Sequence, residues 1–186
     1  MGYYRDFREY LARLEEQGYL YRIKRPINKD TELHPIVRWQ FRGGIPETKR
    51  KAFLFENVTD SQGASFSIPV VVGALGASRF TYALGMQCRP EEIFDKWERS
   101  LASPIEPVMV SRAPVHEVVY TEDDLKQGRF GVHRLPVPIS TPGFDNAPYL
   151  TCSHWITKDP ETGIRNVGNY RAQIKEIGRA SCRERV

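Results

Sequence analysis

Cysteine, long apolar runs and clustered charge are all scarce in this chain. Its 186 residues include three cysteines, Cys88, Cys152 and Cys182, and no two of them stand at the C-x-x-C spacing of a zinc site or redox motif. Such a sparse, odd set favours reduced thiols in the cytosol over a disulfide framework. The amino terminus lacks the apolar core of a signal peptide, and the apolar stretch at residues 68–75 is too short to span a bilayer. We therefore expect a cytoplasmic protein without a transmembrane segment, and peripheral membrane association stays open.

A basic cluster of the kind that binds nucleic acid is also missing. Lysine and arginine number 27 against 23 aspartate and glutamate, a net charge of +4, and they are spread along the chain. An interpretation as a nucleic-acid-binding module would depend on this mild excess alone, so we expect no nucleic-acid partner. Hydrophobic residues make up 40% of the chain and charged residues 27%, which is typical of a globular domain.

The chain opens with an amphipathic helix. Phe7, Tyr10, Leu11 and Leu14 recur at helical spacing, and Asp6 stands where an N-cap belongs. Further helices are expected at residues 33–40, 78–86, 89–101 and 121–127, and strands at residues 20–24, 52–57, 68–72, 115–120, 150–157 and 164–174. Helices and strands do not alternate regularly, so the pattern favours the α+β class over a doubly wound sheet.

The last two expected strands flank a strong turn signal. Residues 159–163 read DPETG, in which proline presets the first corner and glycine allows a positive φ. We therefore predict a β-hairpin. The preceding residues, 135–148, are rich in proline and predict an extended loop.

The carboxyl-terminal residues 176–186, EIGRASCRERV, differ from the rest of the chain. They are charged, lack periodicity, and correspond residue for residue to the translation of a common short-read sequencing adapter. We interpret them as a non-native tail to be left out of fold reasoning, and we expect the gene to continue past about residue 175.

The tract ITKDPETGIRNVGNYR at residues 156–171 is the most specific feature of the chain. It resembles the signature hairpin of the UbiD (3-octaprenyl-4-hydroxybenzoate carboxy-lyase-like) family of non-oxidative decarboxylases. DFREYLARLEEQGYLYRIKRPI, at residues 6–27, is similar to the family's opening helix and strand. KAFLFENV and IPVVVGALGASRFTYALGM, within residues 51–86, are similar to the region that follows. The resemblance runs in order over almost all of residues 4–175.

The resemblance implies an α+β chain whose amino-terminal α/β segment leads into a split β-barrel flavin-binding domain, incomplete here. Its divisions would be residues 1–110, an amino-terminal α+β region, residues 111–175, the start of the split barrel, and residues 176–186, the tail. The family uses prenylated FMN from a separate flavin prenyltransferase, with Mn²⁺ and often K⁺ at the phosphate. It decarboxylates aromatic or α,β-unsaturated acids, 4-hydroxybenzoate-type acids among them, and its members are commonly homo-oligomers. Loss of CO₂ from an sp² carbon needs an electron sink, which the flavin supplies.

The resemblance also implies roles for residues of the hairpin. Asn166 matches the family's metal-binding asparagine, and a carboxamide oxygen suits Mn²⁺. Asn169, Tyr170 and Arg171 match the segment that lines the flavin, although many relatives have an apolar residue in place of Asn169. Arg171 also matches the catalytic arginine beside the substrate carboxylate, which a guanidinium can hold with two hydrogen bonds.

One geometric condition follows from the spacing. Asn166 and Arg171 are five residues apart, so a flat strand would place them on opposite faces. Both can serve one cofactor only if the strand bends between them, and Gly168 is the expected position of that bend.

Two functions therefore remain open. The first is the amino-terminal fragment of a prenylated-FMN-dependent decarboxylase, inactive alone because the family's remaining metal ligand and acidic residues lie further along. The alternative is a non-catalytic flavin-binding or subunit-interaction protein whose short chain is real.

Overall fold

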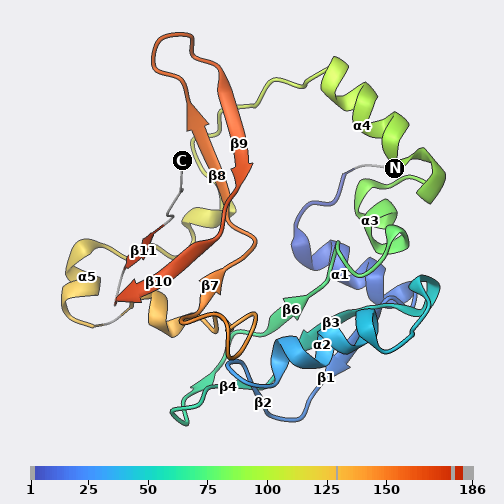
Figure 1. Ribbon diagram of the computed structural model, residues 1–186. Coiled ribbons are helices and arrows are strands. Elements are labelled where there is room, and N and C mark those ends of the chain that lie inside the picture. The colour runs from blue at the N-terminus through green and yellow to red at the C-terminus, as the bar shows by residue number, and fades with distance from the viewer. Residues whose placement is uncertain (1–2, 129, 177–178, 182–186) are drawn as a thin grey trace. The chain divides into compact units, whose positions relative to one another are not determined.

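The computed structural model describes residues 3–128, 130–176 and 179–181 (Figure 1). The chain forms two compact units, each made of separate segments. The first unit comprises Met1–Arg25, Ile36–Glu56 and Pro69–Val119, and the second comprises Pro26–Pro35, Asn57–Ile68 and Tyr120–Val186. Short helices and small open sheets occur together, which confirms the expected α+β class.

A three-stranded sheet lies at the centre of the first unit. Its order is β1 (Leu20–Ile23), β3 (Ala52–Phe55) and β6 (Val70–Val72). Strand β3 pairs with β1 in parallel and with β6 antiparallel. The strands expected at residues 20–24, 52–57 and 68–72 are therefore confirmed, with ends shifted by a few residues.

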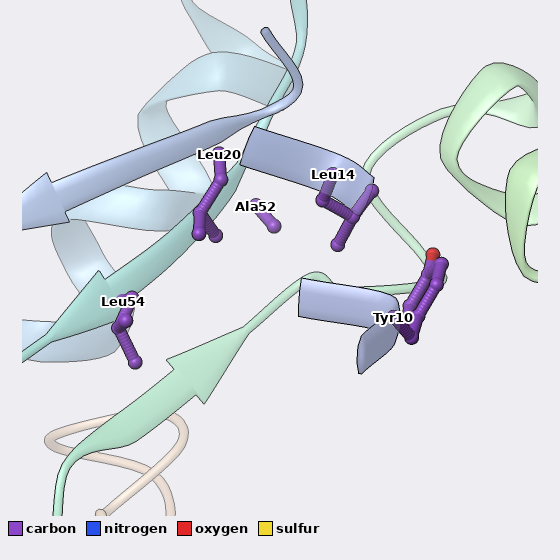
Figure 2. Packing of buried hydrophobic residues seen from close by; sticks show 5 residues of the cluster. All are labelled: Tyr10, Leu14, Leu20, Ala52 and Leu54. Atoms are coloured by element: carbon purple, nitrogen blue, oxygen red, sulfur yellow. The ribbon is translucent and has the colours of Figure 1, made fainter. Parts of the chain in front are cut away.

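Helix α1 (Phe7–Glu16) supplies the other half of this unit's core. Tyr10 and Leu14 are buried on one face and join Leu20, Ala52 and Leu54 of the sheet in a single cluster (Figure 2). Tyr10 and Leu14 are four residues apart, the helical spacing, and Ala52 and Leu54 are two apart, the strand spacing. The core therefore follows from the two periodicities of the sequence.

The ends of α1 are set by local chemistry. The Asp6 carboxylate accepts a hydrogen bond from the backbone N–H of Glu9 at 2.9 Å, which satisfies one of the unpaired donors of the first turn. Gly18, just past the helix, has a φ of +71°, a conformation that favours glycine. The expected N-cap is confirmed.

The remaining helices assigned wholly to the first unit follow β6. Helix α3 (Arg79–Met86) begins at Ser78, whose hydroxyl accepts from the Thr81 N–H while the Thr81 hydroxyl accepts from the Ser78 N–H. Helix α4 (Ile93–Ala102) is preceded by a 3₁₀ turn, Pro90–Glu92. Helix α2 (Leu33–Arg42) begins in the second unit and ends in the first, and a 3₁₀ turn, Glu47–Lys49, follows it.

The described residues of the second unit form three small sheets. Strands β2 (Ile27–Asn28), β4 (Val58–Thr59) and β5 (Ser65–Phe66) form the first, and β7 (Tyr149–Leu150), β10 (Ala172–Glu176) and β11 (Arg179–Ser181) form the second. The third is the hairpin of β8 (His154–Lys158) and β9 (Arg165–Asn169). Helix α5 (Glu122–Lys126) and the 3₁₀ turn Val132–Arg134 precede the proline-rich loop, which has no strand between residues 135 and 148, as expected.

The expectation of a strand at residues 115–120 is wrong. The chain forms a short 3₁₀ turn at Pro114–His116 and no strand in this stretch. Val115, Val118 and Val119 have a high β propensity, but all three are exposed and no described strand pairs with this stretch. Propensity without a partner strand does not form a sheet. The expected strands at residues 150–157 and 164–174 exist, but each is divided in two, and this division shapes the candidate site.

Candidate functional site at the hairpin and its carboxyl end

The hairpin forms around the predicted turn. Its strands are in register from His154 opposite Asn169 to Lys158 opposite Arg165. The Asp159 carboxylate accepts two backbone hydrogen bonds, from Glu161 and Thr162, both at 2.8 Å. These bonds lower the pKa of Asp159, because they stabilise its charged form.

The pairing register shows which predicted site residues share a face. Cross-strand partners lie on one face, so Asn166 shares its face with Thr157, and the alternation places Gly168 there as well. Asn169, opposite His154, points to the other face. The structure therefore separates Asn169 from Asn166 within the strand.

The ring of Tyr170 lies over Gly168, on the same face of the hairpin as Asn166. A Cβ atom at Gly168 would be only 2.2 Å from Cε2 of Tyr170, so the ring occupies the space that any larger residue would need. The backbone N–H of Tyr170 continues the ladder by donating to the carbonyl of Ser153 at 3.2 Å. Glycine at this position thus permits a close approach of ring and backbone.

The chain breaks out of the hairpin at Tyr170 and Arg171. Strand β9 ends at Asn169, and β10 begins at Ala172 in a different sheet, where it pairs with β7. The condition that the strand must deviate between Asn166 and Arg171 is met, but the break comes two residues after Gly168, which itself remains paired with Trp155. The alternation of side chains along β9 therefore does not decide on which face Arg171 lies.

The guanidinium of Arg171 contacts two residues that the sequence analysis did not identify. Its Nη2 donates to Oδ1 of Asp145 at 3.1 Å, and its Cζ lies 4.1 Å from the centre of the Tyr149 ring. The Arg171 side chain is half exposed, at 50%, whereas that of Asp145 is only 15% exposed. Pairing of β7 with β10, with Leu150 opposite Ala172, brings these groups together over a long sequence separation, and no local motif signals the contact.

The residues present offer a metal very little. Asn166 is exposed and contributes one carboxamide oxygen, and within the described part of the chain no three histidine, cysteine, aspartate or glutamate side chains gather where they could hold an ion. These residues alone do not make a metal site, because Mn²⁺ and similar cations take several oxygen or nitrogen ligands.

A planar cofactor meets more suitable surroundings. Tyr170 and Trp155 are 42% and 40% exposed, and Arg171, which follows Tyr170 in the chain, is half exposed and carries five N–H donors. Aromatic rings and a cation fit a flat anionic ligand that stacks and accepts hydrogen bonds.

Comparisons with known proteins place the chain in context. Residues 11–101 match the family described as 3-octaprenyl-4-hydroxybenzoate carboxy-lyase N-terminal domain, and residues 107–183 match its Rift-related domain. An uncharacterised protein of Aquifex aeolicus (strain VF5) is 32% identical over an aligned length of 198 residues. The alignment covers 94% of this chain and 37% of that protein.

Solved structures show the same similarity. The UbiD-class enzyme HmfF of Pelotomaculum thermopropionicum, in complex with FMN, superposes with a TM-score of 0.77 at 27% identity over 95% of this chain and 36% of that one. An evolved dimeric form of HmfF in complex with prFMN gives 0.72 at 28% identity, over 89% and 35% of the two chains. The apo 3,4-dihydroxybenzoic acid decarboxylase of Enterobacter cloacae gives 0.73 at 25% identity, over 95% and 36%. The chain thus spans little more than a third of the length of these relatives.

Proposed function

The chain belongs to the UbiD (3-octaprenyl-4-hydroxybenzoate carboxy-lyase) family, and from this premise we propose that it is the amino-terminal part of a flavin-dependent decarboxylase. The substrate class we propose is an aromatic or α,β-unsaturated carboxylic acid, with the 4-hydroxybenzoate type as one candidate. The full enzyme would be a cytoplasmic homo-oligomer supplied with cofactor by a flavin prenyltransferase. Within the part of the chain that the structure describes, no helix is long and apolar enough to cross a membrane.

The position of Arg171 is the observation that carries this proposal. Its guanidinium stands where β9 leaves the hairpin, half exposed, with one of its donors on Asp145. A guanidinium has five N–H donors in a planar fork, so the remaining ones can hold a substrate carboxylate with two parallel hydrogen bonds. That interaction would orient the acid and keep its carboxylate charged until the bond to CO₂ breaks.

We propose that Asn169, Tyr170 and Arg171 bind the cofactor, prenylated FMN, which supplies the electron sink for decarboxylation. The exposed Tyr170 ring offers a stacking surface and Arg171 offers donors. Asn169 faces the other side of β9, so it can contribute on the Tyr170 side only through its backbone. A backbone contact also tolerates the departure from the apolar residue that many relatives carry there.

For the metal we propose Asn166 as one ligand of Mn²⁺, with K⁺ as a second ion near the phosphate. The single oxygen of Asn166 must be joined by ligands from a longer chain, because the described residues do not provide a complete set. The 186-residue chain is therefore expected to be inactive on its own.

The test is an assay of the gene product extended beyond residue 175, purified with prenylated FMN and Mn²⁺ and offered a panel of aromatic and unsaturated acids. We expect CO₂ release that Arg171→Ala reduces by roughly 100-fold or more in kcat/KM, since a group acting on the reacting carboxylate is lost. Arg165→Ala is the matched control, because Arg165 lies on the same hairpin opposite Lys158. No CO₂ from any acid, or equal losses in the two variants, would overturn the proposal.

One observation favours a second candidate, a non-catalytic flavin-binding or subunit-interaction protein. Ile156 and Val167 are directly opposite each other on the hairpin and are 73% and 61% exposed, an apolar surface suited to another protein. Binding of ordinary FMN without metal, together with no decarboxylation by the extended product, would favour this candidate.

A further inference from the structure

We propose that Asp145 is a positioning residue that fixes the guanidinium of Arg171, with Tyr149 covering one face of the same group. The inference depends on the proposed function for the role of Arg171, but the contact itself can be tested separately. Asp145 would touch neither the substrate nor the cofactor, so its effect on the reaction would pass entirely through Arg171.

The Asp145 carboxylate is held in place by its own turn rather than by Arg171. Its Oδ2 accepts the backbone N–H of Thr141 at 2.9 Å, which leaves Oδ1 for the arginine. The carbonyl of Thr141 in turn accepts the backbone N–H groups of Phe144 and Asp145, at 3.0 and 2.9 Å. With only 15% of its side chain exposed, Asp145 is an acceptor whose position is set before Arg171 meets it.

The loop that carries Asp145 is joined to strand β10, which directly follows Arg171. The Asn146 side-chain oxygen accepts from Nε2 of Gln173 at 2.8 Å, and the Pro148 carbonyl accepts the backbone N–H of Ile174 at 3.0 Å. These two bonds and the pairing of β7 with β10 fix the loop relative to the backbone of Arg171. The position of the Asp145 carboxylate relative to the Arg171 backbone is therefore set by the sheet.

Asp145 and Tyr149 together restrict the guanidinium while leaving most of its donors available. Asp145 takes one N–H at Nη2, and the Tyr149 ring lies 4.1 Å from Cζ. A long arginine side chain at 50% exposure would otherwise sample many rotamers, and binding a carboxylate would have to order it. With the fork already oriented, the ligand meets a fixed pair of donors.

A purely structural role for Asp145 is the alternative, and a neighbouring residue supplies the control. Asn146 also joins the loop to β10, through Gln173, but has no hydrogen bond to Arg171 among those described. Asp145→Asn keeps an oxygen for the Thr141 N–H and removes the charge that attracts the guanidinium. Asn146→Ala weakens the loop attachment and leaves the Asp145–Arg171 pair in place.

The first test uses ¹⁵N NMR of arginine side chains in the 186-residue chain, with the Arg171 signal assigned through Arg171→Lys. We expect wild type and Asn146→Ala to show slowed rotation about Cζ–Nε for Arg171, and Asp145→Asn to show the fast rotation of a free arginine. Asp145→Glu, which keeps the charge, is expected to recover part of the restriction, and it is the variant that decides the matter if Asp145→Asn does not fold. Unchanged rotation in Asp145→Asn, or fast rotation in Asp145→Glu and wild type alike, would overturn the proposal.

The second test uses the extended, cofactor-loaded gene product. Asp145→Asn should lower kcat/KM by roughly 10- to 100-fold in an otherwise wild-type background and should have no further effect when Arg171 is already alanine. Additive losses would mean that Asp145 acts independently of Arg171, which contradicts the proposal. A positive NMR result with no decarboxylation would instead reject the proposed function and leave the positioning contact standing.

Discussion

The hydroxyl of Tyr10 gives the most closely defined prediction for the fold. Tyr10 is 5% exposed, and its hydroxyl oxygen lies 2.7 Å from the carbonyl of Ala74 and 2.8 Å from that of Thr81. Its single O–H is therefore shared between the two carbonyls and joins α1 to the segment that leads into α3 and to α3 itself. Tyr10→Phe keeps the ring and removes the hydroxyl that donates to these two carbonyls. Removing one partner of a buried hydrogen bond costs about 1–3 kcal/mol, and we expect a loss of that size in the free energy of unfolding at pH 7.

The same hydroxyl predicts a particular dependence on pH. Burial raises the pKa of Tyr10 above its ordinary value, with a smaller contribution from nearby Tyr4. Between the ordinary value, about 10, and the raised one, the unfolded chain has lost the phenolic proton and the folded chain has kept it. The contribution of Tyr10 is therefore complete below pH 10 and falls by about 1.4 kcal/mol for each pH unit above it.

Urea unfolding between pH 7 and 11.5 measures both effects. Trp39 and Trp97 report on the first unit in a Trp155→Phe background, and Tyr3→Phe, at an exposed position, is the matched control. We expect the difference between wild type and Tyr10→Phe to be constant up to about pH 10 and to shrink, then reverse, above it. A difference that stays constant to pH 11.5 would refute the reasoning, because the buried hydroxyl would then titrate as it does in the unfolded chain.

Two further predictions concern the core and the hairpin turn. Leu14→Ala, at a fully buried position, should lower the free energy of unfolding by about 2–5 kcal/mol in urea denaturation, whereas Leu101→Ala, at 75% exposure, should change it by less than about 0.5. Because the turn bonds lower the pKa of Asp159, their support is complete above about pH 4 and is lost as the pH falls through the lowered value. Amide exchange at Glu161 and Thr162 should accordingly quicken, relative to the other hairpin amides, at low pH and in Asp159→Ala; equal protection in that variant would contradict this account.

Elements defined by neighbouring residues could be predicted from the sequence. The helical spacing of Tyr10 and Leu14 specifies α1. Asp6, four residues before Tyr10, marks where the helix begins. The DPETG turn likewise specifies the hairpin, since Asp159 bonds to backbone groups only two and three residues away. In both cases the stabilising partners lie inside the window that periodicity and turn chemistry describe.

Features that depend on distant partners could not be predicted in this way. The residues at 115–120 have the composition of a strand and no strand to pair with, whereas residues 164–174 pair with two different sheets and so divide at Tyr170 and Arg171. Asp145 and Tyr149 reach Arg171 only because β7 pairs with β10. The hairpin that carries the candidate residues was thus predictable, and the groups that surround the arginine were not.

We propose the division of the chain into residues 1–110, 111–175 and 176–186, with a non-native origin for the last of these segments. Both proposals bear on the central claim that this chain is the amino-terminal part of a longer decarboxylase. The most direct test is to read the native DNA, with long adapter-free reads, across the codon for Lys175. We predict that the native frame departs from the EIGRASCRERV sequence and continues for several hundred codons, supplying the further metal ligand and acidic residues that the hairpin lacks. Native DNA that encodes residues 176–186 as they stand and then a stop codon would contradict the claim and leave a short flavin-binding or interaction protein in its place.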